Sequence, residues 1–225
     1  MLGVYEVMER LITDYPNLLL ENCSGGGGRF DAGMLFYSPQ IWASDDTDAV
    51  ERLKIQHGTS ICYPVSAMGA HVSDCPNHTV GRTTPFSTRG HVAMVGTFGY
   101  ELDVTRIPQE DRDAIPSQIA EFNRYNPLIR MGDQYRIGNT FEDNTWDAVM
   151  FVAKDKSEAL FMYVQVLNSP NKRSKRIKLK GLDEKRIYVN GESGQELSGG
   201  ALMNAGINVA MYGDFSSRVI HFKAK

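Results

Sequence analysis

Three aspartates and a threonine follow a short apolar segment in the stretch WASDDTD, residues 42–48. Carboxyl groups placed just after a strand are a frequent active-site arrangement in α/β barrels, where one of them can act as a general acid or base. The same residues also suit the N-cap and acidic first turn of a helix, a role that favours a charged carboxylate. If Asp46 or Thr47 is the cap, Asp45 is free to point into a binding site. The residues alone leave catalysis by Asp45 and helix capping both open.

Four consecutive glycines lie between Ser24 and Arg29 in the stretch LENCSGGGGRFD, residues 20–31. A phosphate-binding loop would need the spacing G-x-G-x-x-G or a following Lys-Ser/Thr pair, and neither is present. A linker is disfavoured because the glycines lie between an apolar segment and an aromatic run rather than between domains. Glycines after a strand let a ligand approach the main chain closely. We therefore favour a ligand contact, with a strained turn that binds nothing as the alternative.

Histidines and cysteines are frequent between residues 57 and 78, where Cys75 and His78 have C-x-x-H spacing. No C-x-x-C or H-x-x-x-H pair accompanies them, and the residues fall on several expected elements, so we predict no metal site and no cofactor. Cys23 has no base placed by the sequence, which favours a pocket-lining role over a nucleophilic one. The set considered is His57, Cys62, His71, Cys75 and His78.

The composition argues against several classes of function. The chain has 225 residues, a net charge of −3 and 42% hydrophobic residues, so neither nucleic acid nor an anionic membrane is an expected partner. No run of 18 apolar residues predicts a membrane span, and the first 20 residues lack the features of a secretory signal. Three cysteines, an odd count, favour a reducing compartment. We expect a cytoplasmic protein.

Strands and helices alternate over about the first 130 residues, which predicts a parallel α/β unit. Four strand–helix units are too few to close an eight-stranded barrel, and an open doubly wound sheet is the alternative. The expected strands are 18–22 (buried on both faces), 40–44, 66–73 and 97–104. The expected helices are 3–15, 45–58 ending at Gly58, 87–96 and 108–128, the last one interrupted by Pro116.

A second, antiparallel β domain, a sandwich, is predicted beyond residue 130, where no helix of comparable quality follows. The predicted division is residues 1–130 and 131–225. A basic run spans residues 172–186, but Ile177 and Leu179 alternate there with Lys178 and Lys180, which indicates a solvated strand face rather than a nucleic-acid site. The expected strands are 147–154, 158–167, 176–181, 186–190 and 218–225.

Several long segments together resemble the α-galactosidases of glycoside hydrolase family 36, the melibiase or raffinose-cleaving group. They are ENCSGGGGRFDAGML, PQIWASDDTDAVERLKIQHGTS, SAMGAHVS, TRGHVAMVGTFGYELD and the late LMNAGINV…GDFSSRVIHF. The resemblance runs along essentially the whole chain. It implies α/β plus all-β architecture: the second half of a (β/α)8 barrel followed by a C-terminal antiparallel β-sandwich domain, which is the C-terminal portion of a family member.

The resemblance also implies roles for individual residues. The first aspartate of the family's W-x-S-D-[DN]-T-D motif is the acid/base, which here is Asp45. Cys23 and Gly25, with Ser24 between them, correspond to the wall of the galactose subsite. Trp42 and Arg29 are expected to support the same site, with Trp42 among its substrate-binding residues. The family's nucleophile lies in a K-[WY]-D-x-N segment that this sequence lacks; Lys154 and Asp155 form only a superficially similar pair.

These observations predict a retaining α-galactosidase, which hydrolyses terminal non-reducing α-D-galactose from galactosides of the melibiose or raffinose type. The chain carries the acid/base but not the nucleophile. A half-barrel exposes strand edges and apolar surface, so we expect a homo-oligomer or a complementing N-terminal chain. The alternatives are a non-catalytic galactose-binding or interaction module and one half of a split enzyme.

Overall fold

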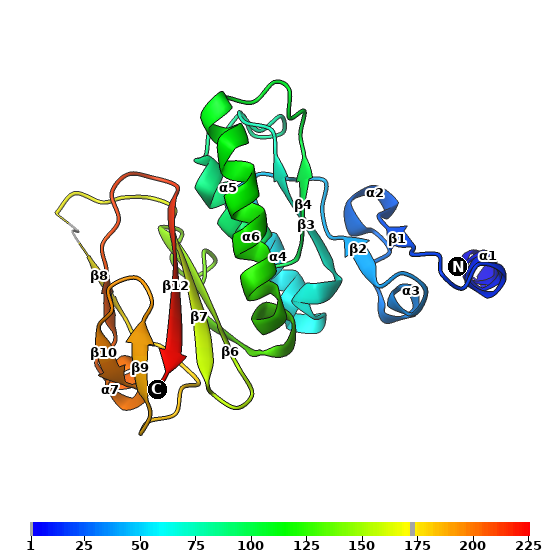
Figure 1. Cartoon of the computed structure of the whole chain (residues 1–225). Coiled ribbons are helices and arrows are strands. Elements are labelled where there is room, and N and C mark those ends of the chain that lie inside the picture. The colour runs from blue at the N-terminus through cyan, green and yellow to red at the C-terminus, as the bar shows by residue number, and fades with distance from the viewer. Residues whose placement is uncertain (1, 172–173) are drawn as a thin grey trace.

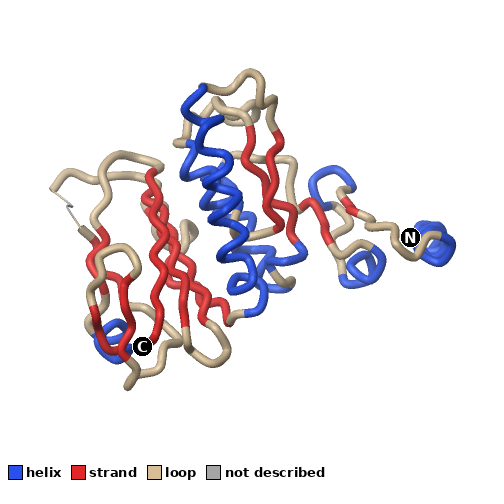
Figure 2. The backbone as a smooth tube through the Cα atoms, in the orientation of Figure 1, coloured by secondary structure: helices blue, strands red, loops and turns tan. Residues whose placement is uncertain are grey.

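A computed structural model describes residues 2–171 and 174–225 of the chain (Figure 1). A four-stranded parallel sheet with its helices forms one part of the molecule, and an antiparallel β unit forms the other. The long helix α6 (Gln109–Met131) lies between the two parts, and the N-terminal helix lies at the end of the parallel sheet farthest from the β unit (Figures 1 and 2).

The parallel sheet has the strand order β1-β2-β3-β4, so each strand pairs with the next one along the chain. This order is typical of successive β/α units. The strands are β1 (Glu21–Asn22), β2 (Gln40–Trp42), β3 (Met68–Ser73) and β4 (Thr97–Glu101). The helices other than α6 are α1 (Leu2–Asp14), α2 (Ser24–Gly27), α3 (Ala32–Tyr37), α4 (Ala49–Cys62), the 3₁₀ turn η1 (Val65–Ala67) and α5 (Phe86–Ala93).

The antiparallel unit consists of a six-stranded sheet, order β10-β9-β12-β7-β6-β5, and a two-stranded sheet, β11-β8. The expectation of a second, antiparallel β unit is thus confirmed. Its strands are β5 (Asp133–Gly138), β6 (Trp146–Val152), β7 (Glu158–Gln165), β8 (Lys175–Ile177), β9 (Ile187–Asn190), β10 (Glu196–Ser198), β11 (Ile207–Val209) and β12 (Ser216–Ala224), and its helix is α7 (Gly199–Asn204).

Strand β7 is buried on both faces, which explains its nearly continuous apolar sequence. Phe161 and Tyr163 pack with residues of β8, β11 and α7 in one core. Leu160 and Met162, which alternate with them along the strand, pack with residues of α6 in a second core. The six-stranded sheet therefore joins the β unit to the helices of the parallel unit. On its other face it is covered by the two-stranded sheet.

The prediction of a strand buried on both faces over residues 18–22 is wrong. Only Glu21–Asn22 forms a strand, and Leu18 and Leu19 are 42% and 84% exposed. Strand β1 lies at the edge of the sheet and pairs only with β2. Within the described ranges, no second strand is present to bury these leucines.

Two helices differ from their predicted bounds. Helix α4 begins at Ala49 rather than at residue 45 and continues through Gly58 to Cys62. Gly58 has room for a side chain and lacks a positive φ, so it weakens the helix without ending it. Helix α6 is not interrupted at Pro116, since proline removes a single backbone donor and Pro116 lies on an exposed face.

Short elements of the β unit were not anticipated, namely β5, β10, β11 and helix α7. Strand β8 is also shorter than predicted. In the basic run, Ile177 and Leu179 are 3% and 2% exposed while Lys178 and Lys180 are exposed, so the solvated-face prediction is confirmed for these positions. Residues 172 and 173 of that run lie outside the described residues.

Candidate active site

The segments that follow strands β1 and β2 meet at one edge of the parallel sheet. Glu21 pairs with Gln40 and Asn22 with Ile41, so the two strands end at the same level. The carboxyl ends of parallel strands are where α/β folds place ligands. The glycine loop, residues 23–28, and the acidic loop, residues 43–48, are therefore neighbours.

Cys23 and Asp45 face each other across this edge. The Cys23 sulfur lies 4.0 Å from Oδ1 of Asp45, and both side chains are exposed. Among the described residues, this thiol is the only side chain that contacts the Asp45 carboxylate with a polar atom. Asp45 is thus an accessible carboxyl group whose oxygens are available to a ligand.

The glycine loop adopts a left-handed backbone that explains its composition. Residues Ser24, Gly25, Gly26 and Gly27 have φ values of 63°, 65°, 71° and 85°, a region that side chains disfavour. A Cβ atom on Gly26 would lie 3.0 Å from the Asp45 backbone nitrogen, and one on Gly27 would lie 2.7 Å from the Trp42 carbonyl oxygen. The bare backbone therefore packs directly against the acidic loop.

The N-cap of helix α4 is Asp48, not Asp46 or Thr47. Its Oδ1 accepts hydrogen bonds from the backbone nitrogens of Val50 and Glu51 at 3.0 and 3.1 Å. Asp46 in turn accepts from the Asp48 backbone nitrogen at 3.0 Å. Neither Asp46 nor Thr47, the two caps considered in the sequence, fills the role, but the consequence is the same: the cap lies beyond Asp45, which is left uncommitted.

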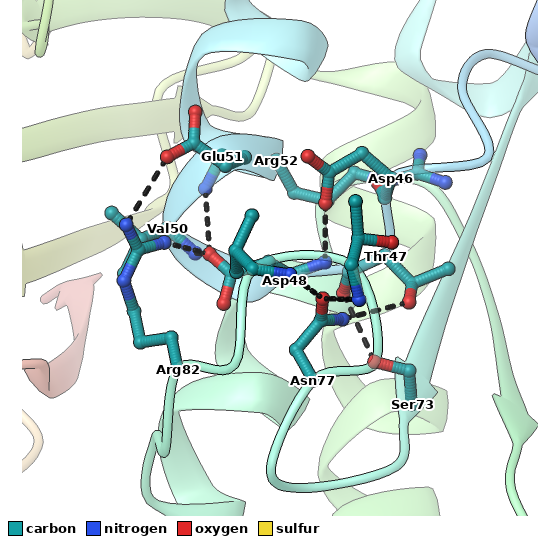
Figure 3. Close-up of polar contacts among 11 residues, drawn as sticks. Asp46, Thr47, Asp48, Val50, Glu51, Arg52, Ser73, Asn77 and Arg82 are labelled. Atoms are coloured by element: carbon teal, nitrogen blue, oxygen red, sulfur yellow. Dashed lines mark hydrogen bonds and ion pairs between the residues drawn. The ribbon is translucent and has the colours of Figure 1, made fainter.

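The end of β3 and the loop after it hold the acidic loop from its other side (Figure 3). Ser73 donates to the Thr47 carbonyl at 3.0 Å, and Asn77 donates to the Thr47 hydroxyl at 3.1 Å. Arg82 forms ion pairs with Asp48 and Glu51. These contacts fix the end of the acidic loop and the start of α4 against the neighbouring β/α unit.

Two family models match the chain on either side of the junction between its two parts. The Melibiase model matches residues 1–132, and the Glycosyl hydrolase family 36 C-terminal domain model matches residues 146–222. The first match alone covers more than half of the chain. The chain belongs to glycoside hydrolase family 36. The resemblance seen in the sequence is confirmed.

Family 36 relatives match over nearly the whole chain. The bifunctional α-galactosidase/sucrose kinase AgaSK of Mediterraneibacter gnavus is 52% identical over 206 residues, which are 92% of this chain and 22% of AgaSK. α-Galactosidase AgaA of Geobacillus stearothermophilus is 48% identical over 225 residues, 100% of this chain and 31% of AgaA. A crystal structure of an AgaA variant in complex with raffinose matches with a TM-score of 0.96 and 47% identity, covering 100% of this chain and 31% of that one. The chain spans less than a third of the length of these relatives.

Trp42 is buried in this family 36 chain rather than part of an open surface. It is 8% exposed, its ring stacks on His71 with centroids 4.6 Å apart, and the Arg52 guanidinium carbon lies 4.2 Å from its centroid. Arg29, in contrast, is exposed and makes no hydrogen bond or ion pair with the described residues. The structure thus places Cys23, Gly26 and Asp45 together, while the Trp42 ring packs on His71 and Arg52.

No group of three metal-ligating side chains occurs in the described part of this family 36 chain. The cysteines and histidines considered above are spread over α4, β3 and the loop after β3. All three cysteines are free thiols. No helix among residues 2–171 and 174–225 is long and apolar enough to cross a membrane.

Four side chains that secure the site were missed by the sequence reasoning, because each acts across two loops. They are Arg52, Ser73, Asn77 and Arg82. One of them had a signal in the sequence. Arg52 follows Ala49 by three residues and precedes Gln56 by four, so helical spacing places this charged residue on the buried face of α4.

Proposed function

We propose that this chain supplies the acid/base and one wall of the galactose site of a retaining α-galactosidase. The observation that carries the proposal is the exposed Asp45 carboxyl, held beside Cys23 and the glycine loop at the carboxyl edge of the parallel sheet. The family 36 relatives that match the chain are named α-galactosidases, which supplies the reaction class.

In the proposed mechanism, Asp45 donates its proton to the glycosidic oxygen as the bond to galactose breaks. It then accepts a proton from the water that releases the sugar. A retaining enzyme needs a second carboxylate about 5–5.5 Å from the first, as nucleophile. Asp46 and Asp48 do not suit this role, because each accepts a backbone hydrogen bond at the start of α4. The nucleophile has to come from a K-[WY]-D-x-N segment outside this sequence; Lys154 and Asp155 lie instead in the exposed turn between β6 and β7.

The galactose wall is formed in this proposal by Cys23, Ser24 and Gly25, with Trp42 behind it. A Cβ atom on Gly25 would meet nothing within 4 Å, so the space over this glycine is open to a sugar hydroxyl. The Ser24 hydroxyl donates to the Asn22 side chain at 3.1 Å, which orients it at the same edge. The expected substrates are α-galactosides of the melibiose or raffinose type, and AgaA has been crystallised with raffinose.

The four parallel strands correspond, in this proposal, to the second half of a (β/α)8 barrel. We place this unit at residues 1–130 and the β-sandwich domain at 131–225, since α6 ends at Met131 and β5 begins at Asp133. Strand β1 has a free edge, and the leucines before it are exposed. A homo-oligomer or a complementing N-terminal chain would cover that edge, and the odd number of cysteines favours a cytoplasmic location.

Aryl α-galactoside hydrolysis tests the proposal. The purified chain should release no nitrophenol by itself, and turnover by the chain alone would contradict the assignment of a missing nucleophile. Co-expression with a segment that carries K-[WY]-D-x-N should restore turnover at saturating substrate, and Asp45→Asn should remove most of that turnover, because the step that releases galactose then lacks its base. Asp74→Asn is the matched control, because Asp74 is an exposed aspartate on the next loop of the same edge.

The absence of the K-[WY]-D-x-N segment from the sequence also favours a second candidate, a non-catalytic galactose-binding module. This candidate requires the wall formed by Cys23 and Gly25 to bind galactose without the opposite half. Calorimetry with galactose distinguishes the two. Binding by the chain alone that is unchanged by Asp45→Asn supports the module, whereas activity restored by a complementing segment supports the enzyme.

A further inference from the structure

The carbonyl groups on both sides of Asp45 are held by a single side chain. Arg52 donates from Nη2 to the Ser44 carbonyl at 2.7 Å and from Nε to the Asp46 carbonyl at 2.8 Å. Its remaining nitrogen, Nη1, donates to the Gly69 carbonyl in β3 at 3.1 Å. Figure 3 shows Arg52 reaching from α4 toward Asp46. One guanidinium thus ties the residues before and after Asp45 to the neighbouring strand.

Only arginine fits this position. Arg52 is 3% exposed, and the Trp42 ring lies 4.2 Å from its guanidinium carbon. Burial lowers the pKa of Arg52 to about 10, so the group is still charged at neutral pH. Its partners are three carbonyl oxygens in three directions, which a planar fork of five donors can reach at once. A lysine would keep the charge but lose this geometry.

Arg52 holds a part of the acidic loop that the other contacts leave free. Ser73, Asn77 and Arg82 bind Thr47, Asp48 and Glu51, all of which follow Asp46. Around Asp45 itself, the other contacts are the Cys23 sulfur, 4.0 Å from Oδ1 of Asp45, and a local hydrogen bond from the Asp46 nitrogen to the Ser44 hydroxyl at 3.1 Å. The direction of the Asp45 side chain therefore depends on Arg52, on the Cys23 thiol and on the close approach of Gly26.

We propose that Arg52 is a positioning residue that sets where the Asp45 carboxyl stands relative to the glycosidic oxygen. The inference rests on the proposed function of Asp45 as the acid/base. A displacement of about 1 Å can cost a positioned catalytic group ~100-fold in rate. The cost should fall on proton transfer, because Arg52 does not face the substrate and reaches it only through Asp45.

The kinetic test uses the enzyme formed by this chain and the segment carrying the nucleophile. Arg52→Lys should lower kcat/KM roughly 100-fold for phenyl α-galactoside, whose leaving group needs a proton. For dinitrophenyl α-galactoside, whose leaving group needs none, the loss should be less than ~10-fold. Asp45→Asn should give the same difference between the two substrates, whereas Arg82→Lys, on the other side of the loop, should affect both substrates equally. An equal loss on both substrates for Arg52→Lys overturns the inference. If Asp45→Asn shows no split, the proposed function itself is wrong.

Amide hydrogen exchange on the chain alone provides a readout that needs no activity. Arg52→Lys should accelerate exchange of the Asp46 amide at least ~10-fold while amides of the core strand β7 stay within about 3-fold of the parent, which marks local opening. In Arg82→Lys the faster amides should instead be those of Val50 and Glu51, which bond to Asp48. Acceleration that includes β7 equally would show that Arg52 only stabilises the fold, and no acceleration at Asp46 would overturn the inference.

Discussion

His91 in α5 and Ser217 in β12 are joined across the two parts of the molecule, with 2.7 Å between the Nδ1 atom and the hydroxyl oxygen. Thr88, one turn earlier in α5, lies 2.8 Å from the same hydroxyl and donates to the Phe215 carbonyl at 2.7 Å. Thr88 has no exposed surface. A partly buried polar seam therefore joins α5 to the β unit.

Thr88→Val is expected to destabilise the chain by ~1–3 kcal/mol, because it removes both hydrogen bonds of the Thr88 hydroxyl, each worth ~0.5–1.5 kcal/mol. Urea denaturation followed by circular dichroism measures the change. Thr79→Val is the control, since Thr79 is exposed and its hydroxyl bonds to none of the described residues. A loss below about 0.5 kcal/mol in Thr88→Val, comparable to an ordinary surface substitution, would contradict the role of the seam.

Asp147 predicts an unusual dependence of stability on pH. It is 8% exposed and lines a cavity of about 40 Å³ together with His57, His91 and Arg136, and its Oδ2 atom has no hydrogen-bond partner among the described residues. Burial raises the pKa of Asp147 to about 7, opposed in part by a backbone hydrogen bond from Thr140. Between its ordinary value of 3.8 and about 7, the folded state holds a proton that the unfolded state has released.

The contribution of Asp147 is therefore fully present below pH 3.8 and is lost as the pH rises to about 7, with a slope of up to ~1.4 kcal/mol per pH unit. Asp147→Asn should remove this slope and be more stable than the parent at pH 8. Denaturation at a series of pH values tests this, with Asp74→Asn as the exposed control. Parallel pH curves for parent and Asp147→Asn would refute the prediction.

Gly27→Ala should be more damaging than Gly25→Ala, although both glycines have a positive φ. The left-handed conformation costs an alanine roughly 1–2 kcal/mol at either position. At Gly27 the new Cβ would also lie 2.7 Å from the Trp42 carbonyl oxygen, whereas at Gly25 it would meet nothing. Free energies of unfolding from denaturant titration compare the two. Equal losses would mean that the glycine loop does not press on the acidic loop as described.

Local signals in the sequence were sufficient for most of the fold. The nearly continuous apolar run of β7 and the helical spacing in α4 both reflect which faces are buried, and burial determines the residue types. The same local signals failed where contacts with residues outside the segment determine its secondary structure. Residues 18–22 are apolar enough for a buried strand, but only a second neighbouring strand could bury them. Pro116 was treated as a break, although the flanking turns keep their hydrogen bonds and continue the helix.

The site was predicted unevenly for the same reason. The grouping of Cys23, the glycines and Asp45 follows from their positions after adjacent parallel strands, which the order of the sequence already contains. The Asp48 cap and the Arg52 hydrogen bonds depend on the exact path of an irregular loop. A sequence pattern gives residue types and the spacing of apolar residues, and neither of these determines the path of the loop. The helical spacing of Arg52 from Ala49 and Gln56 was the one available clue.

The exposed leucines before β1 predict self-association of the chain. Leu19 is 84% exposed next to an unpaired strand edge, and Val7 and Phe36 on the adjoining helices are 57% and 73% exposed. Apolar surface beside an open edge favours pairing with another chain. Sedimentation velocity should therefore show concentration-dependent oligomers, and Leu19→Glu should shift the population toward monomer. Leu167→Glu, at a 40% exposed leucine of the β unit, is the control and should leave the distribution unchanged. Oligomers that persist in Leu19→Glu but dissociate in Leu167→Glu would place the contact on the β unit instead.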